Sequence, residues 1–221
     1  MRRLAGEALT SPFGQPPQSR PRRIWQLPAY VGNGPYCFTN SLVMMLDGGA
    51  PPTHVVETFT GAPFGCQLLA GELPLFDPRT GGTRSSAPTR RCCCSGFQAR
   101  RTTHRDGDSA LEALRQESAL GPVLVGPVDM GRLVHQPGSD RFSGADHFVV
   151  VTAADRSEVT FHDPQGHPYV VLPTPAFLSA WRAEAIGYLQ DEAYVMRTAI
   201  RRTHDGAVQD ALCALVPIAA R

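Results

Sequence analysis

The sequence contains no lysine, and arginine therefore supplies all 21 of its basic residues. Against 20 acidic residues this leaves a formal net charge of +1, which gives no general electrostatic reason to bind nucleic acid or an anionic membrane. There is no apolar run of about 18 residues, the length that a transmembrane helix needs. The first residues also lack the long apolar core of a secretory signal peptide. We therefore expect a cytoplasmic protein with neither a nucleic-acid nor a membrane partner.

A regular cysteine spacing is also lacking. The six cysteines are Cys37, Cys66, Cys92, Cys93, Cys94 and Cys213. Three consecutive cysteines and three isolated ones do not form a disulfide framework. The consecutive cysteines also lack the two-residue spacer that lets two thiolates reach one zinc ion. No phosphate-binding loop of the GxxxxGK[ST] kind occurs. We expect no metal and no cofactor.

The length of 221 residues predicts a single domain with flanking segments. Residues 1–30 are rich in proline, glycine and polar residues and are predicted to form a flexible arm. Residues 31–200 are predicted to form the main domain, and 201–221 a C-terminal helix. The segment 79–105 has seven arginines, no acidic residue and no apolar period. It is predicted to be disordered, and its composition also fits a GC-rich gene read out of frame, which sequencing of the source DNA would test.

The remaining sequence predicts helices packed on an antiparallel sheet. Apolar residues at helical spacing predict a buried helix that begins at Cys37 and ends before Gly48. The apolar run 148–151 is typical of a strand buried on both faces. Further helices are predicted over 53–59, 106–118 and 175–190, and strands over 122–130, 146–155, 158–164, 169–173 and 194–200. This order predicts an α+β fold.

Cys37 is the first candidate for chemistry because it follows a Gly-Pro turn and opens a helix. The unpaired N–H groups and the aligned dipoles of a helix N-terminus favour a thiolate and can hold a developing oxyanion. A buried structural cysteine is the alternative for this residue taken alone.

His147 and Asp163 are the second candidate feature. His147 opens one strand, and Asp163 ends the next strand of the same hairpin, so the two are predicted to be cross-strand neighbours. A carboxylate beside an imidazole can fix its tautomer and stabilise its cation. With Cys37, the pair would form a set of nucleophile, base and orienting group.

These residues lie in segments that resemble a known family. The segments are GPYCFTNSLVMML, ADHFVVVTAAD and VTFHDPQGHPYVVLP, together with VLVGPVDMGRL. They resemble the papain-like peptidase C39 class, and more closely the N-terminal domain of butirosin biosynthesis protein H. The resemblance spans roughly residues 30–195, with 79–105 unmatched.

The resemblance implies a papain-like α+β fold in which Cys37 is the nucleophile, His147 the base and Asp163 the orienting group. It implies acyl transfer or hydrolysis through an acyl-enzyme, in secondary-metabolite biosynthesis, with an acyl carrier protein thioester or a peptide as substrate. C39 peptidases usually carry an oxyanion-hole glutamine shortly before the cysteine. This sequence has none there, and Asn33 and Asn40 are the candidate replacements. The missing glutamine favours the alternative, a catalytically inactive papain-like binding module.

Overall fold

The computed structural model describes residues 28–32, 36–46, 50–60, 67–69, 73–75, 97–189 and 192–202. The helices are α1 (Cys37–Met44), α2 (Thr53–Thr60), α3 (Gly107–Ser118) and α4 (Thr174–Trp181), with 3₁₀ helices η2 (Met130–Arg132) and η3 (Ser139–Phe142). The strands are β1 (Gln67–Leu69), β2 (Leu73–Leu75), β3 (Phe97–Thr102), β4 (Val123–Asp129), β5 (Asp146–Ala154), β6 (Glu158–Asp163), β7 (His167–Pro173) and β8 (Met196–Arg202). The fold is thus mixed α+β, as predicted.

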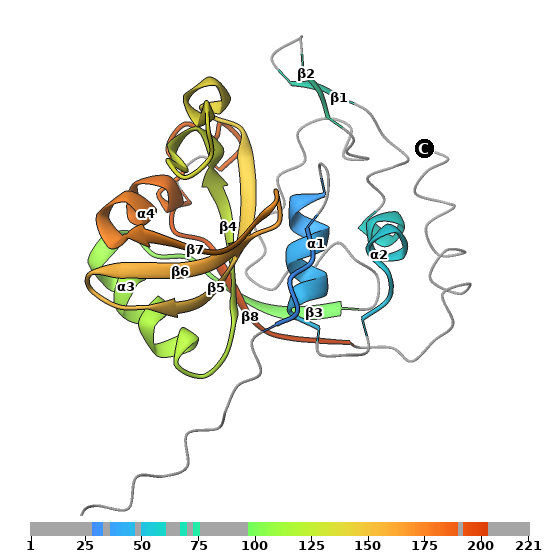
Figure 1. Cartoon of the computed structure of the whole chain (residues 1–221), viewed down its shortest axis with the longest axis horizontal. Coiled ribbons are helices and arrows are strands. Elements are labelled where there is room, and N and C mark those ends of the chain that lie inside the picture. Colours follow the sequence, from blue (N-terminus) through green and yellow to red (C-terminus); the bar gives the residue numbers. More distant parts are fainter. Residues whose placement is uncertain are drawn as a thin grey trace, which may run out of the picture.

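Six strands form one antiparallel sheet in the order β3-β8-β4-β5-β6-β7 (Figure 1). β5, β6 and β7 are consecutive in the chain and in the sheet, so the strands predicted over 146–155, 158–164 and 169–173 form an antiparallel meander. β8 lies between β3 and β4 and pairs with both. β1 and β2 form a separate two-stranded sheet.

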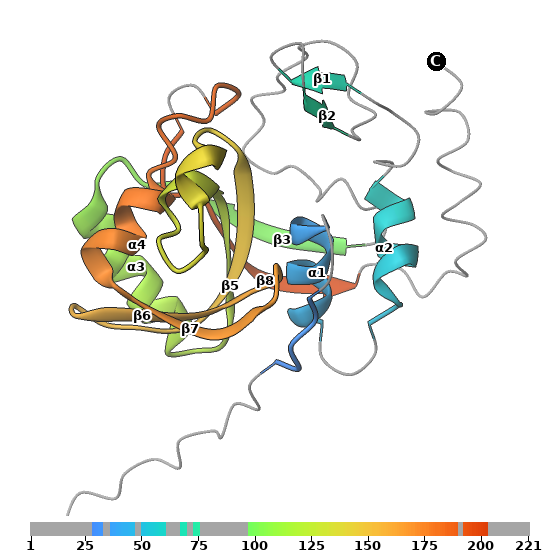
Figure 2. The same cartoon turned by 45° about the horizontal axis from the view of Figure 1, so that its top comes forward.

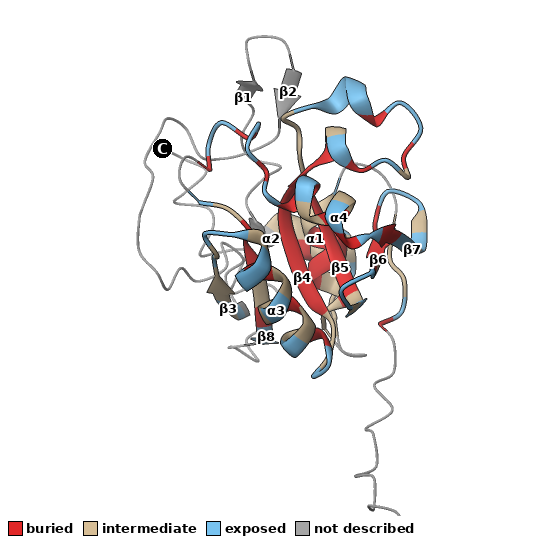
Figure 3. Ribbon diagram, turned by 90° about the vertical axis from the view of Figure 1, so that its left-hand side faces the viewer, coloured by how far each residue is buried: buried red, intermediate tan, exposed pale blue. Residues whose placement is uncertain are grey.

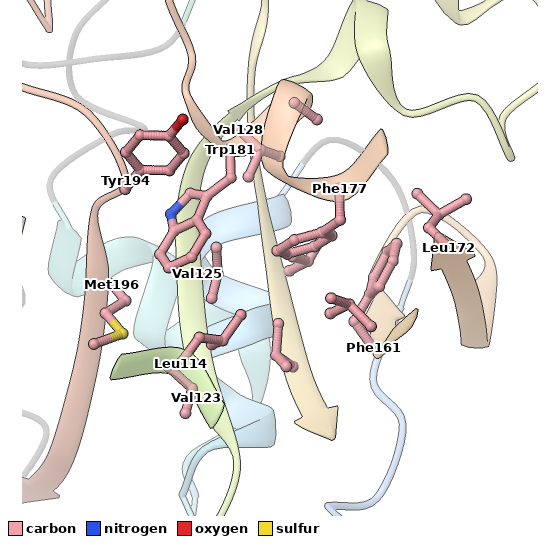
Figure 4. Close-up of a cluster of buried hydrophobic side chains, with 14 of the residues drawn as sticks. Leu114, Val123, Val125, Val128, Phe161, Leu172, Phe177, Trp181, Tyr194 and Met196 are labelled. Carbon is pink, nitrogen blue, oxygen red and sulfur yellow. The ribbon is translucent and has the colours of Figure 1, made fainter. Parts of the chain in front are cut away.

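The central strands are covered on both faces. All seven residues of β4 are buried, and the middle of β5 is buried as well (Figure 3). Helices α1 and α2 lie on one side of the sheet, and α3 and α4 on the other (Figures 1 and 2). The larger apolar cluster, on the α3 and α4 side, includes Trp181, Phe177, Phe161 and Leu114 (Figure 4). The smaller cluster is formed by Leu42, Val56, Leu124 and Phe148. The apolar runs of β4 and β5 follow from this double coverage.

α1 is attached to β5 by both apolar and polar contacts. The Phe38 and Phe148 rings meet edge to face, with centroids 5.0 Å apart. The Ser41 hydroxyl donates to the Phe148 carbonyl at 3.1 Å. Because Cys37 begins α1 and His147 directly precedes Phe148, these contacts hold the thiol-bearing helix against the strand that carries the histidine.

The structure corrects part of the expectation for residues 79–105. Residues 97–102 form β3, which pairs with β8 along its length. Arg100 contacts Glu117 at 2.5 Å, and Arg101 makes two bonds to Glu192 at 2.5 and 3.1 Å. The sequence did not reveal this strand because its partner strand lies about 100 residues away and its arginines pair with acidic groups on other elements.

The predicted helix over 106–118 is confirmed to within one residue, whereas the helix predicted over 175–190 is too long. α3 follows the N-cap residue Asp106, whose carboxylate accepts the Ser109 N–H at 2.8 Å. α4 ends at Trp181 instead of 190, and Ala183 follows with a φ of 55°, which a helix cannot continue through.

Several predictions lie outside the described residues. These are residues 1–27 of the arm predicted over 1–30, residues 79–96 of the segment predicted to be disordered over 79–105, and residues 203–221 of the C-terminal helix predicted over 201–221. Among the helices that the structure describes, none combines the length and apolar character needed to cross a membrane.

Candidate active site

Cys37 lies at the N-terminus of α1, directly after the N-cap residue Tyr36. Its thiol is free, and the residue is partly exposed and packs against the smaller apolar cluster. The Asn40 N–H closes the first helical turn on the Tyr36 carbonyl at 2.8 Å. The N–H groups of residues 37–39 therefore have no acceptor within the helix. Cys37 is a partly exposed residue beside these donors.

The structure brings His147 and Asp163 together, as the hairpin register predicts. His147 is 2% exposed, and its Nε2 lies 2.7 Å from Asp163 Oδ1. An ionised carboxylate can only accept, so the His147 Nε2–H donates. The His147 ring also hydrogen-bonds to the Cys37 side chain. Since Nε2 is bound to Asp163, the geometry leaves Nδ1 for Cys37, and the three side chains form one chain of contacts.

The electrostatics of this chain favour a protonated imidazole. Burial by itself would lower the pKa of His147, but the hydrogen bonds and negative charges of Asp163 and Cys37 raise that pKa to about 10. Burial raises the pKa of Asp163, but hydrogen bonds from His135 and His147 and the charge on His147 bring it well below its ordinary value. At neutral pH the site therefore holds an imidazolium between a carboxylate and the Cys37 sulfur.

No family model matches the chain. A search of curated proteins finds a relative in Bacillus subtilis (strain 168) that carries the name uncharacterized protein YobF. The two are 32% identical over 162 residues, which is 72% of this chain and 52% of the relative. The chain thus spans about half the length of that relative. The resemblance to C39 peptidases and to the butirosin protein rests on the quoted segments and remains a prediction.

The two predicted oxyanion-hole candidates have different outcomes. Asn33 lies outside the described residues. Asn40 is fully buried in α1, three residues after Cys37. Its place one turn along the same helix is compatible with a role near the sulfur, and that role stays a prediction.

Two residues that contact Asp163 were missed by the sequence analysis. His135 Nε2 lies 2.7 Å from Asp163 Oδ2, and the Gln136 amide donates to the same oxygen at 2.5 Å. Both belong to the irregular segment between β4 and β5, where no periodicity indicates which side chains point inward. The feature of the sequence that could have indicated them is a His-Gln pair in a Gly- and Pro-containing loop, shortly before the strand that carries His147.

Tyr30 is a third missed residue. Its hydroxyl donates to the Asp163 carbonyl at 2.9 Å and accepts the Gly166 N–H at 2.8 Å. A Cβ at Gly32 would lie 2.1 Å from the Tyr30 hydroxyl oxygen, so glycine is required there. The two hydrogen bonds of the Tyr30 hydroxyl hold the segment before Cys37 against the turn that carries Asp163.

The two histidines near that turn, His162 and His167, differ in burial. His162 is fully buried, its Nδ1 accepts the Tyr169 N–H at 3.1 Å, and burial lowers its pKa. His167 is partly exposed and pairs with Asp163 across the turn. Within the described ranges, no group of three or more His, Cys, Asp or Glu side chains is arranged to hold a metal ion.

Proposed function

We propose that the chain is a papain-like cysteine enzyme that forms an acyl-enzyme at Cys37 and transfers the acyl group to an amine or to water. The observation that carries this proposal is the contact chain Cys37–His147–Asp163, in which Cys37 is a partly exposed residue. The antiparallel sheet with α1 packed on it supports the papain-like reading.

The reaction begins with the Cys37 sulfur as a thiolate beside the His147 imidazolium. The thiolate attacks the carbonyl carbon of a thioester or amide, and the carbonyl oxygen becomes an oxyanion. The N–H groups in the first turn of α1 are the donors available to that oxygen. As the intermediate collapses, the His147 proton passes to the leaving thiol or amine, and a thioester remains on Cys37.

The second half of the reaction reverses these roles. Neutral His147 accepts a proton from the incoming amine or water as that nucleophile attacks the Cys37 thioester. The product acyl group leaves on the amine or as a carboxylic acid, and the thiolate and imidazolium are restored. Asp163 keeps the His147 Nε2–H bond throughout, so it orients the ring and stabilises its cation.

A thioester donor and an amine acceptor form the preferred substrate pair, because the quoted segments resemble the butirosin domain more closely than the peptidases. An acyl carrier protein would present such a thioester. A peptide substrate belongs to the wider class and is the second possibility to assay.

The test is turnover of acyl-pantetheine thioesters in the presence of a primary amine, followed by the release of free thiol and by analysis of the products. We expect Cys37→Ala to reduce turnover to the uncatalysed background, and His147→Ala to reduce it by about 100-fold or more. Cys213→Ala is the matched control, since it removes a different thiol, and it should keep the wild-type rate.

Equal turnover by wild type and Cys37→Ala would overturn the proposal. An intact fold without turnover of thioesters or peptides would instead support a papain-like binding module. Amide as the product would identify a transferase, and free acid a hydrolase.

A further inference from the structure

The Asp163 carboxylate has all its acceptor positions filled. Oδ1 accepts from His147 Nε2 at 2.7 Å and from the Gln165 N–H at 2.8 Å. Oδ2 accepts from His135 Nε2 at 2.7 Å and from Gln136 Nε2 at 2.5 Å. The side chain is fully buried. A carboxylate offers about four lone-pair positions, so the bonds to Oδ2 determine which way Oδ1 points.

The loop that carries His135 is held firmly at both ends. Asp129 is fully buried at the end of β4, and its Oδ1 accepts the N–H groups of Gly131 at 2.9 Å and Gly144 at 3.0 Å. Leu133, two residues before His135, is fully buried in the main core. The loop therefore presents His135 from a defined position.

The His135 ring is held by its faces and edges and uses one nitrogen for a polar contact. It meets Phe161 and His167 edge to face, with centroids 5.4 and 5.3 Å apart. Its Nδ1 is buried, and no atom of the described residues hydrogen-bonds to it. Among the described residues, Asp163 is therefore the hydrogen-bond partner of this ring.

These contacts lead to a specific role. We propose that His135 is a positioning residue for the Cys37–His147–Asp163 chain: its Nε2–H holds Asp163 Oδ2 so that Oδ1 stays aimed at His147. The inference rests on the proposed function for its kinetic consequence, but its structural consequence does not depend on any substrate.

Two substitutions separate the hydrogen bond from the bulk of the ring. His135→Gln places an amide N–H close to the position of Nε2, whereas His135→Leu removes the donor. In the leucine variant we expect thioester turnover to fall about 10-fold in kcat with KM unchanged, and the glutamine variant to recover most of that loss.

The second measurement is the proton spectrum of protein with ¹⁵N-labelled histidine. The wild type should show two low-field imidazole N–H signals, from His147 Nε2 and His135 Nε2, because both donate to a buried carboxylate. His135→Gln should keep the His147 signal, and His135→Leu should weaken it or move it upfield. Gln136→Met, which removes the other Oδ2 donor, should act in the same direction.

Three results would overturn the inference: a wild-type spectrum without the His135 signal, a folded His135→Leu variant with wild-type rate and spectrum, or a glutamine variant as impaired as the leucine variant. Circular dichroism establishes that the variants fold. If His135→Leu does not fold, the wild-type spectrum and Gln136→Met decide. If the wild type shows no turnover but the spectra behave as expected, the proposed reaction fails while the positioning role holds.

Discussion

At the scale of single residues, the site places opposite charges where water does not reach them. His147 and Asp163 are both almost fully buried, and burying either charge without a partner would cost free energy. Together they satisfy one another, since the carboxylate accepts from the ring at 2.7 Å. A buried ion pair is weak evidence for stability, because desolvation offsets much of the attraction. The arrangement is easier to explain as a means of holding a proton beside the Cys37 sulfur.

The first prediction concerns that proton. In a titration followed by NMR of labelled histidines, the His147 ring should keep its proton up to a pKa of about 10. In Asp163→Asn the neutral amide no longer stabilises the cation, so the pKa should fall toward the ordinary value of about 6.5. A His147 ring that titrates near its ordinary value in the wild type would contradict the charge arrangement.

The second prediction concerns stability as a function of pH. The raised pKa of His147 adds stability that is full below the unfolded-state value of about 6.5 and is lost as pH rises through about 10. The lowered pKa of Asp163 adds stability that is present above about 3.9 and is lost as the solution becomes more acidic. Urea unfolding should therefore show the pair's contribution to be largest between about pH 4 and 6.5. The double variant His147→Gln/Asp163→Asn should lack this dependence, and an unchanged profile would count against the pair.

At the scale of elements, three segments that are distant in the sequence meet at the turn between β6 and β7. The residues 28–32 reach it through Tyr30, the loop after β4 through His135, and β5 through His147. Asp163 is the common contact, by its side chain for the two histidines and by its carbonyl for Tyr30. The turn therefore connects all three segments of the site through Asp163.

The third prediction tests the attachment of the segment before Cys37. Burial raises the pKa of Tyr30, so its hydroxyl stays protonated and donates to Asp163. Tyr30→Phe removes two hydrogen bonds and should lower the free energy of unfolding by about 1–3 kcal/mol. It should also slow thioester turnover, because the approach to Cys37 is no longer fixed. Tyr169→Phe is the matched control. Both tyrosine rings contact the His162 ring edge to face, but Tyr169 is 55% exposed. Equal effects of the two substitutions would refute the attachment role.

The pairing of His147 with Asp163 could be predicted from the sequence because both lie in one hairpin, where the short turn sets the register. The helix at Cys37 could be predicted from its apolar spacing. The insertion of β8 between β3 and β4 could not, because it depends on pairing between strands far apart in the chain. His135 was missed because loop residues follow no period, and only the folded loop shows that the ring points at Asp163.

At the scale of the whole molecule, the sheet joins two apolar clusters that use opposite faces of the same strands. In β4, Val125 belongs to the larger cluster and Leu124 to the smaller one. The Cys37 helix packs on the smaller cluster, whereas the His135 loop is anchored in the larger one through Leu133. The site consequently depends on both faces being packed.

The fourth prediction follows from this double packing. Leu42→Ala opens a cavity in the smaller cluster and should cost about 2–5 kcal/mol of unfolding free energy. Because the clusters share β4 and β5, we expect one cooperative transition by tryptophan fluorescence and by circular dichroism, shifted to lower denaturant. Val171→Ala, at a side chain that is 51% exposed, should change stability by less than about 0.5 kcal/mol. Two separate transitions would mean that the faces fold independently.

The central claim is that Cys37 becomes acylated with His147 as its proton partner. The most direct measurement is the mass of the protein and of its Cys37 peptide after brief reaction with an acyl thioester and quenching in acid. We expect wild type to gain one acyl group on Cys37, with no gain on that peptide in Cys37→Ala and a much slower gain in His147→Ala. Acylation of Cys37 at the same rate in wild type and His147→Ala, or acylation of other cysteines only, would contradict the account.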